Sequence, residues 1–291
     1  MRVTRAAHSR APASGLAARG RKPIAVALRC GAWLKESDTA WRAGAVALFI
    51  ALWQVLALAN REFQVVNPLF MVPPLDLRHT VVRQWSEGIL IADLTASMTT
   101  AAKGYLLGCS VGLVTGIISG YLRLVQRLWD PVVQIFRPIP PLAFLPMFIL
   151  YLGIGDLTRV LFIAYAVYFY TYMNAMQGVM HVDPVYVRAA LALGARRPRI
   201  FWSIILPGSM PHVMTGLRVS AGMALFVLVA AELIAADQGI GYRIMWARQY
   251  FQVDTMLFDA FLIGFLGFVI DTGMRWIERR VLRWKPEAAE Q

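Results

Sequence analysis

The feature that most constrains this chain is a series of apolar blocks, each close to 20 residues long. An α-helix rises about 1.5 Å per residue, so about 20 apolar residues cross the hydrocarbon core of a bilayer. Charged residues make up 16% of the 291 residues and hydrophobic residues 58%. A soluble domain carries about 25% charged residues. The sequence therefore predicts an all-α integral membrane protein.

Six transmembrane helices are expected. The spans run over residues 41–59, 95–122, about 138–152, 159–180, 212–236 and 256–276. Residues 41–280 form the transmembrane domain, which includes an internal loop at residues 181–211. Residues 1–40 are rich in Arg, Ala and Ser and are expected to form a basic cytoplasmic tail without regular structure, and residues 281–291 form a second tail.

The distribution of Lys and Arg over the loops sets the expected orientation. Of the 29 basic residues, 22 fall in the segments that this layout places on one side: residues 1–42, 121–137, 181–218 and 274–291. Loops on the cytoplasmic side carry the excess of Lys and Arg. Both termini and the loop at residues 181–211 are therefore expected in the cytoplasm, with the chain crossing the membrane several times.

Several chemistries find no support in the residues. No stretch interleaves aromatic residues with Lys and Arg as a nucleic-acid surface does. No G-x-x-x-x-G-K-[ST] phosphate loop, H-E-x-x-H motif or Cys/His metal cluster occurs, and Cys30 and Cys109 make no metal pair. We therefore expect no catalytic residue, no metal and no bound cofactor, and active transport would need ATP hydrolysis by another subunit.

Glycines recur at every fourth position in the second span. Residues at that spacing share one helix face, and small residues let helix backbones approach closely in lipid. The repeat fits either a tightly packed helix pair or a face that slides during gating, and packing is the favoured interpretation. The glycines are Gly104, Gly108, Gly112, Gly116 and Gly120.

Three further features are candidates for a pathway or gate. Prolines break the start of the third span, and backbone that is not helical at membrane depth is tolerated only where protein or a watery cavity covers it. Three tyrosines share one face of the fourth span. One acid lies near the outer end of the fifth span with no evident local partner. These residues are Pro138, Pro140 and Pro141, then Tyr165, Tyr168 and Tyr172, and finally Glu232.

Each of these candidates also has a plainer reading. The prolines fit an ordinary kinked helix start, the tyrosines fit packing with a satisfied hydroxyl, and Glu232 fits a side chain that faces the external loop. Asp271, near the inner end of the sixth span, is read as an i,i+4 partner of Arg275.

The loop at residues 181–211 reads as two short helices with a bend. Asp183 is suited to cap the first helix, Pro184 fits its first position, and Gly194 allows the backbone to turn. Pro198 starts the second helix, and Leu206-Pro207-Gly208 is expected to end it.

This loop resembles the cytoplasmic coupling loop of bacterial ABC-transporter permeases. In that family E-A-A, three residues and Gly precede nine residues, Ile, one residue and Leu-Pro. The matching residues here are Ala189, Ala190, Gly194, Ile204, Leu206 and Pro207, whereas Arg188 stands in the place of the family's Glu. The resemblance covers residues 93–284 and is closest to the nitrate/sulfonate/taurine importers, through residues 136–155, 231–242 and 278–284.

The resemblance implies a type I ABC importer permease fold of the MetI-like kind. It implies a homodimer, two cytoplasmic ATP-binding subunits docked on residues such as Asp183 and Arg188, and a periplasmic or lipid-anchored solute-binding protein. The solute would be a small anion like nitrate, a sulfonate or taurine, or a related small molecule. The alternative is a stand-alone channel or membrane-embedded enzyme, which would leave the loop pattern unexplained.

Overall fold

The computed structural model describes residues 23–284, and all regular structure in that range is helical. The chain divides into two units, residues 1–63 and 64–291. The first unit contains α1 (Pro23–Phe63), of which Ala43–Phe63 is long and apolar enough to cross a bilayer. The expected tail over residues 1–40 lies outside the described residues as far as residue 22, and from Pro23 on it belongs to α1.

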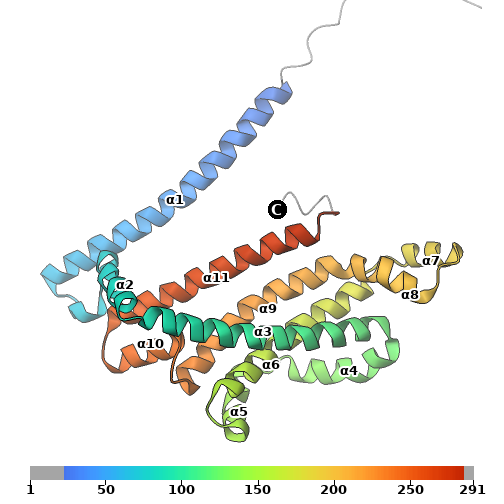
Figure 1. Ribbon diagram of the computed structural model, residues 1–291. Coiled ribbons are helices and arrows are strands. Elements are labelled where there is room, and N and C mark those ends of the chain that lie inside the picture. The colour runs from blue at the N-terminus through green and yellow to red at the C-terminus, as the bar shows by residue number, and fades with distance from the viewer. Residues whose placement is uncertain (1–22, 285–291) are drawn as a thin grey trace, which may run out of the picture. The chain divides into compact units, whose positions relative to one another are not determined.

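The second unit is a bundle of long helices with short helices at its ends (Figure 1). In chain order its elements are η1 (Pro68–Phe70), η2 (Pro74–Asp76), α2 (Leu77–Ser86), α3 (Ile89–Tyr121), α4 (Arg123–Phe136), η3 (Pro141–Phe144), α5 (Leu145–Leu152), α6 (Asp156–Met180), α7 (Pro184–Ala192), α8 (Arg197–Ile200), the π-helical turn η4 (Phe201–Ile205), α9 (Leu206–Ala235), α10 (Ile240–Gln249) and α11 (Val253–Val281). Of the expected tail over residues 281–291, residues 285–291 lie outside the description.

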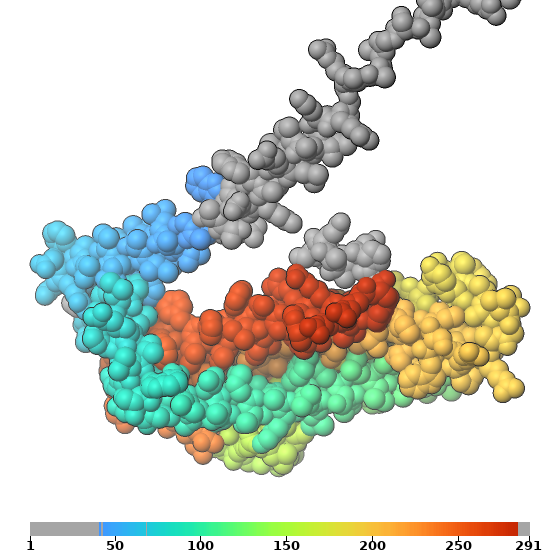
Figure 2. All heavy atoms as spheres, turned by 45° about the horizontal axis from the view of Figure 1, so that its top comes forward, coloured from blue at the N-terminus to red at the C-terminus, as the bar shows by residue number. Residues whose placement is uncertain are grey.

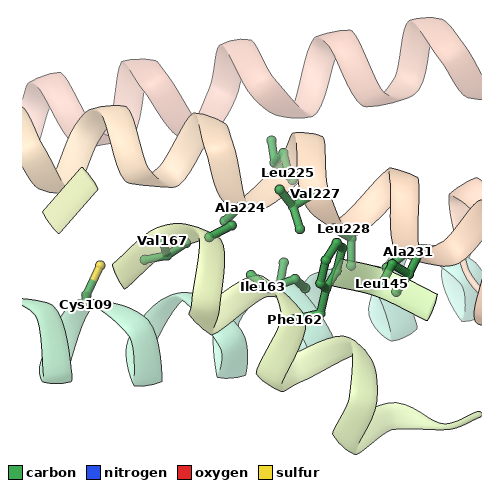
Figure 3. Packing of buried hydrophobic residues seen from close by; sticks show 12 residues of the cluster. Cys109, Leu145, Phe162, Ile163, Val167, Ala224, Leu225, Val227, Leu228 and Ala231 are labelled. Carbon is green, nitrogen blue, oxygen red and sulfur yellow. The ribbon is translucent and has the colours of Figure 1, made fainter. Parts of the chain in front are cut away.

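The core of the bundle is the packing of α6 between α3 and α9. Figure 3 shows this region, with Cys109 on α3, Phe162 and Ile163 on α6, and Leu228 on α9 pointing into one cluster. Leu145 of α5 closes the cluster from the side. Because lipid tails are as apolar as these side chains, close packing and interhelical hydrogen bonds stabilise the bundle more than expulsion of water does.

Polar side chains tie the same three helices together. Thr171 of α6 lies 2.8 Å from the hydroxyl of Ser220 on α9 and 3.5 Å from the sulfur of Cys109 on α3. The hydroxyl of Tyr105 on α3 donates to the carbonyl oxygen of Leu217 on α9 at 3.0 Å.

The glycine repeat of α3 lies along α6. A Cβ added at Gly108 would lie 2.5 Å from the carbonyl oxygen of Ala164, and one at Gly116 would lie 2.6 Å from that of Tyr172. The other three glycines of the repeat would meet α6 atoms at 2.6 to 2.9 Å. The repeat therefore lets the two helices touch along their length, with no room for a side chain.

The prolines of the third span produce a sharp break. The helix pair Arg123–Phe136 and Pro141–Leu152 is bent by 85°, and Pro141 opens the 3-10 turn between the two parts. The basic segment at residues 121–137, which the expected layout leaves between two spans, is not a loop, because Arg123 and Arg127 lie in the 14-residue helix α4. A proline inside that helix, Pro131, obscured the helical pattern in the sequence.

Four helices of the described residues are long and apolar enough to cross a membrane, or five if the bent pair counts as one span. They are Ala43–Phe63, Ile89–Tyr121, Arg197–Ala235 and Val253–Val281. Helix α6 is not among them, although it is central in the bundle. Many of its side chains face other helices, and Thr171, for example, contacts the hydroxyl of Ser220 on α9. The amide of Asn174 donates to the carbonyl oxygen of Tyr170 within α6 itself.

Candidate functional site: the loop at residues 181–211 and the polar cluster at α10

The first part of the loop at residues 181–211, hereafter the docking loop, is a capped helix. The Asp183 carboxylate accepts from the backbone N–H of Val185 at 2.8 Å, and Pro184 occupies the first turn of α7. At the other end, the N–H of Gly194 donates to the carbonyl of Leu191, and that of Ala195 to Ala190. This pair of bonds is a Schellman motif, with Gly194 in the left-handed region at φ 76°.

The second part of the docking loop continues directly into a long helix. Pro198 lies in the first turn of α8, as expected, but Leu206-Pro207-Gly208 does not end the helix. Instead η4 leads into α9, and Pro207 occupies its first turn. Proline fits the first turn of a helix as well as it fits the residues after one. The prediction that Pro207 marks the end of a helix was therefore wrong, because it marks the start of α9.

The inner face of the docking loop is fixed by apolar packing. Val179 at the end of α6, Ile200 and Ile205 are buried together, and Ala190 and Ile204 pack against them. The ring of Phe201 meets that of Tyr121, at the end of α3, at 5.1 Å. Two of the expected docking residues, Ala190 and Ile204, therefore hold the loop on the bundle.

The outer face of the docking loop is exposed, basic and apolar. Arg188 and Ala189 are exposed, and Leu193 is 88% exposed. Among the described residues, no acidic side chain lies within ion-pairing distance of the loop's four arginines, which are Arg188, Arg196, Arg197 and Arg199. Figure 2 shows this segment, in yellow, at one end of the second unit. An acidic partner surface would complement it.

At the opposite end, α10 begins on a cluster of buried polar groups. Glu232 of α9 is 1% exposed and accepts from the Ser97 hydroxyl at 2.7 Å and from the backbone N–H of Gly241 at 2.8 Å. Asp93 of α3 accepts from the backbone N–H of Gly239 at 3.0 Å and from the Arg243 guanidinium at 2.8 Å. Glu232 therefore faces α3 and α10, and α10 lies within the segment expected as the loop after the fifth span, as the plainer interpretation of Glu232 predicts.

Asp93, Ser97 and Asp259 were not among the residues expected from the sequence to form a site. Asp259 of α11 is 2% exposed and accepts from the Gln84 amide at 3.2 Å. A signal was present, because Asp93 and Asp259 are acids within apolar helices. A nearby cavity of about 230 Å³ is lined by Arg83, Gln84 and Arg243, among others. Its two arginines are paired with acids of the chain itself, Arg83 with Asp254 and Arg243 with Asp93.

The prolines and tyrosines of the expected pathway come together, away from the partners of Glu232. Tyr165 packs edge-on against Phe144 of η3 at 5.2 Å, and Tyr168 stacks on Tyr172. The hydroxyl of Tyr168 accepts from the indole N–H of Trp129 on α4 at 2.7 Å. Tyr172 is fully buried. In this structure the three tyrosines pack against α4 and the proline break.

The N-terminal half of α9 and the C-terminal half of α11 are joined by ion pairs. Asp271 pairs with Arg275 at the expected i,i+4 spacing. It also accepts from Arg218 of α9 at 3.0 Å, and Arg218 lies 3.4 Å from Glu278. These are half-exposed pairs, which contribute up to about 1 kcal/mol each.

Comparisons with known proteins agree with this arrangement. A family model described as the binding-protein-dependent transport system inner membrane component matches residues 112–283. The taurine transport system permease protein TauC of Escherichia coli is 32% identical, over 88% of this chain and 93% of that protein. The putative aliphatic sulfonates transport permease protein SsuC of Bacillus subtilis is 33% identical, over 82% and 85%.

Two proteins of lower sequence identity are also similar to this chain. The nitrate import permease protein NrtB of Synechococcus elongatus is 26% identical, over 80% of this chain and 86% of that protein. A chain of the MetNI methionine ABC transporter, solved in inward-facing conformations, has a TM-score of 0.51 and 19% identity, over 69% of this chain and 95% of that chain. The chain described here belongs to the family of binding-protein-dependent transport system inner membrane components, and it is an ABC importer permease subunit of the nitrate/sulfonate/taurine type.

Proposed function

We propose that two copies of this chain form the pathway by which a small solute, similar to nitrate, a sulfonate or taurine, crosses the bacterial inner membrane. Each copy has six spans and both termini in the cytoplasm. Two separate ATP-binding subunits hydrolyse ATP and bind the docking loops, and a solute-binding protein outside the membrane delivers the solute. The permease itself binds no cofactor and has no catalytic residue.

Six spans are supported by the apolar helices together with the position of α6. The bent pair α4–α5 supplies the fifth span, and α6 supplies the sixth because it packs between α3 and α9, which are both long and apolar. A helix surrounded by other helices needs no apolar surface toward lipid, so a hydropathy threshold is the wrong test for it.

The observation that carries the proposal is the construction of the docking loop. Its inner face is packed onto the ends of α3 and α6, and α7 is capped at both ends, so the loop is stiff. Its outer face presents arginines with no acidic partner in the described part of the chain. A stiff loop with an uncompensated surface is suited to receive a partner and to pass its movement into α9.

The charge of this surface can be tested with the purified complex. Arg188→Glu should weaken binding of the native ATP-binding subunits roughly tenfold, which is about 1.4 kcal/mol, because it replaces attraction to an acidic cleft by repulsion. Arg248→Glu is the matched control, since Arg248 is exposed on α10 at the opposite end of the unit. The measurement is the affinity of the ATP-binding subunits for the permease, in detergent or nanodiscs at fixed salt concentration. Equal affinity of the wild-type and Arg188→Glu chains would contradict the proposal.

The solute class can be tested on the partner binding protein. We expect taurine, an aliphatic sulfonate or nitrate to raise its Tm, because bound ligand stabilises the folded state by mass action. Uptake of the same compound should then require this permease. A binding protein that is stabilised only by cations or sugars would overturn the proposed solute class and would leave the importer assignment intact.

A further inference from the structure

The first turn of α10 is held entirely by side chains of two other helices. The backbone N–H groups of Gly239, Ile240 and Gly241 donate to Asp93 at 3.0 Å, to Ser97 at 2.9 Å and to Glu232 at 2.8 Å, respectively. The first N–H groups of a helix have no partner within the helix, and negative charge near them is favourable. Here α3 supplies two of the three acceptors, and α9 supplies the third.

Both carboxylate oxygens of Glu232 take part in these contacts. Its second oxygen accepts from Ser97, whose hydroxyl in turn accepts from Ile240, so one side chain links α9 to both α3 and α10. Gly239 and Gly241 leave the space that Glu232 occupies. A Cβ at Gly239 would lie 2.5 Å from a carboxylate oxygen of Glu232, and a Cβ at Gly241 would lie 2.7 Å from its Cβ. Glu232 is only 1% exposed, so its carboxylate is not accessible to a solute in this structure.

The helix that carries Glu232 also carries the end of the docking loop. Helix α9 begins at Leu206 and ends at Ala235, and its 30 residues span about 45 Å. In Figure 1 its two ends lie beside α8 and α10. A displacement of the docking loop is thus connected, through one continuous helix, to the point where α10 is fastened.

We propose that Glu232, Ser97 and Asp93 form a latch that makes α10 follow the movement of α9, so that ATP binding by the subunits attached to the docking loop repositions α10 at the opposite end of the permease. Glu232 is a positioning residue in this scheme, and its carboxylate does not touch the solute. The inference rests on the proposed function, because the ATP-binding subunits supply the movement.

One arm of the test needs neither ATP nor a partner. Glu232→Asp keeps the charge but is too short to reach the N–H of Gly241, whereas Glu232→Gln keeps the length and accepts the same hydrogen bond. In hydrogen–deuterium exchange of the nanodisc-embedded chain, the amides of Ile240 and Gly241 should exchange at least tenfold faster in Glu232→Asp than in Glu232→Gln. Gln238→Asn in the same segment is the matched control, because the Gln238 side chain is exposed. Equal exchange in Glu232→Asp and wild type would overturn the latch.

The second arm measures movement in the complex with its ATP-binding subunits. Cys30 and Cys109 are replaced by Ala, and a nitroxide is attached through Arg248→Cys on α10 in both copies. The distance between the two nitroxides should change on vanadate trapping of ATP in the wild-type background and in Glu232→Gln. In Glu232→Asp the change should be lost although ATP is still hydrolysed.

The outcomes separate the latch from the proposed function. Complexes that hydrolyse ATP and move α10 equally in wild type and Glu232→Asp would overturn the latch and leave the importer intact, and so would a wild-type complex that hydrolyses ATP without moving α10. If no ATP-binding subunit associates with the wild-type chain, the proposed function fails, and the coupling role of the latch fails with it.

Discussion

Gly108 and Gly222 are both glycines inside long helices, but their surroundings differ. An added Cβ at Gly108 would lie 2.5 Å from a backbone oxygen of α6, which cannot move aside as a side chain can. At Gly222 the same atom would have nothing within 4 Å. Replacing each glycine by Ala therefore tests two effects separately: a steric clash between helices at Gly108, and the low helix propensity of glycine at Gly222.

Gly108→Ala and Gly222→Ala should therefore move stability in opposite directions. Overpacking at Gly108 should cost about 1–3 kcal/mol, because α3 and α6 must separate. Gly222→Ala should stabilise by up to about 1 kcal/mol, the propensity difference between Gly and Ala in a helix. Thermal unfolding of the purified chain, followed by Trp fluorescence, measures both changes. A Gly108→Ala variant as stable as wild type would contradict the close packing of α3 on α6.

At single residues, the sequence predicts contacts between residues close together in the chain but not contacts between residues far apart in it. The glycine repeat could be recognised in the sequence, since residues four apart share a helix face whatever they pack against. The partners of Glu232 could not be predicted from the sequence, because Ser97 lies 135 residues before it in the chain and only the fold brings the two together. The same reason hid Arg218 as a second partner of Asp271, whereas the local partner Arg275 was predicted.

At the scale of elements, helix α7 depends on the conformation of one residue. Gly194 closes its Schellman motif with a φ of 76°, and nothing lies within 4 Å of an added Cβ. A substitution there strains the backbone without a steric clash, so its effect is confined to the end of α7. Both caps of this helix were predicted from Asp183, Pro184 and Gly194, because capping is a property of neighbouring residues.

Gly194→Leu should uncouple ATP hydrolysis from solute uptake. A left-handed Leu costs about 1–2 kcal/mol, so the end of α7 frays and transmits less of the partner's movement. We expect uptake to fall at least fivefold at unchanged membrane insertion, measured in proteoliposomes with the ATPase rate recorded in parallel. Gly194→Asn is the control, because Asn adopts the left-handed region more readily and should retain most uptake. Solute uptake by Gly194→Leu at the wild-type rate would contradict this explanation.

Across the whole molecule, the second unit places its two polar features at opposite ends (Figures 1 and 2). The docking loop lies at one end and the α10 cluster at the other, and α9 runs between them. The all-helical membrane class and most of the spans followed from the apolar blocks alone. The break of the third span into α4 and α5 was only partly foreseen, because the 85° bend depends on how both halves pack.

The central claim is that the docking loop is where the ATP-binding subunits attach, and site-specific photo-crosslinking tests it most directly. A photo-reactive residue is placed at Leu193, which is 88% exposed on the docking loop, and separately at Tyr250, which is 61% exposed after α10. In membranes that contain the whole transporter, Leu193 should crosslink to the ATP-binding subunit and Tyr250 should not. Crosslinks to that subunit from Tyr250 with none from Leu193 would contradict the account.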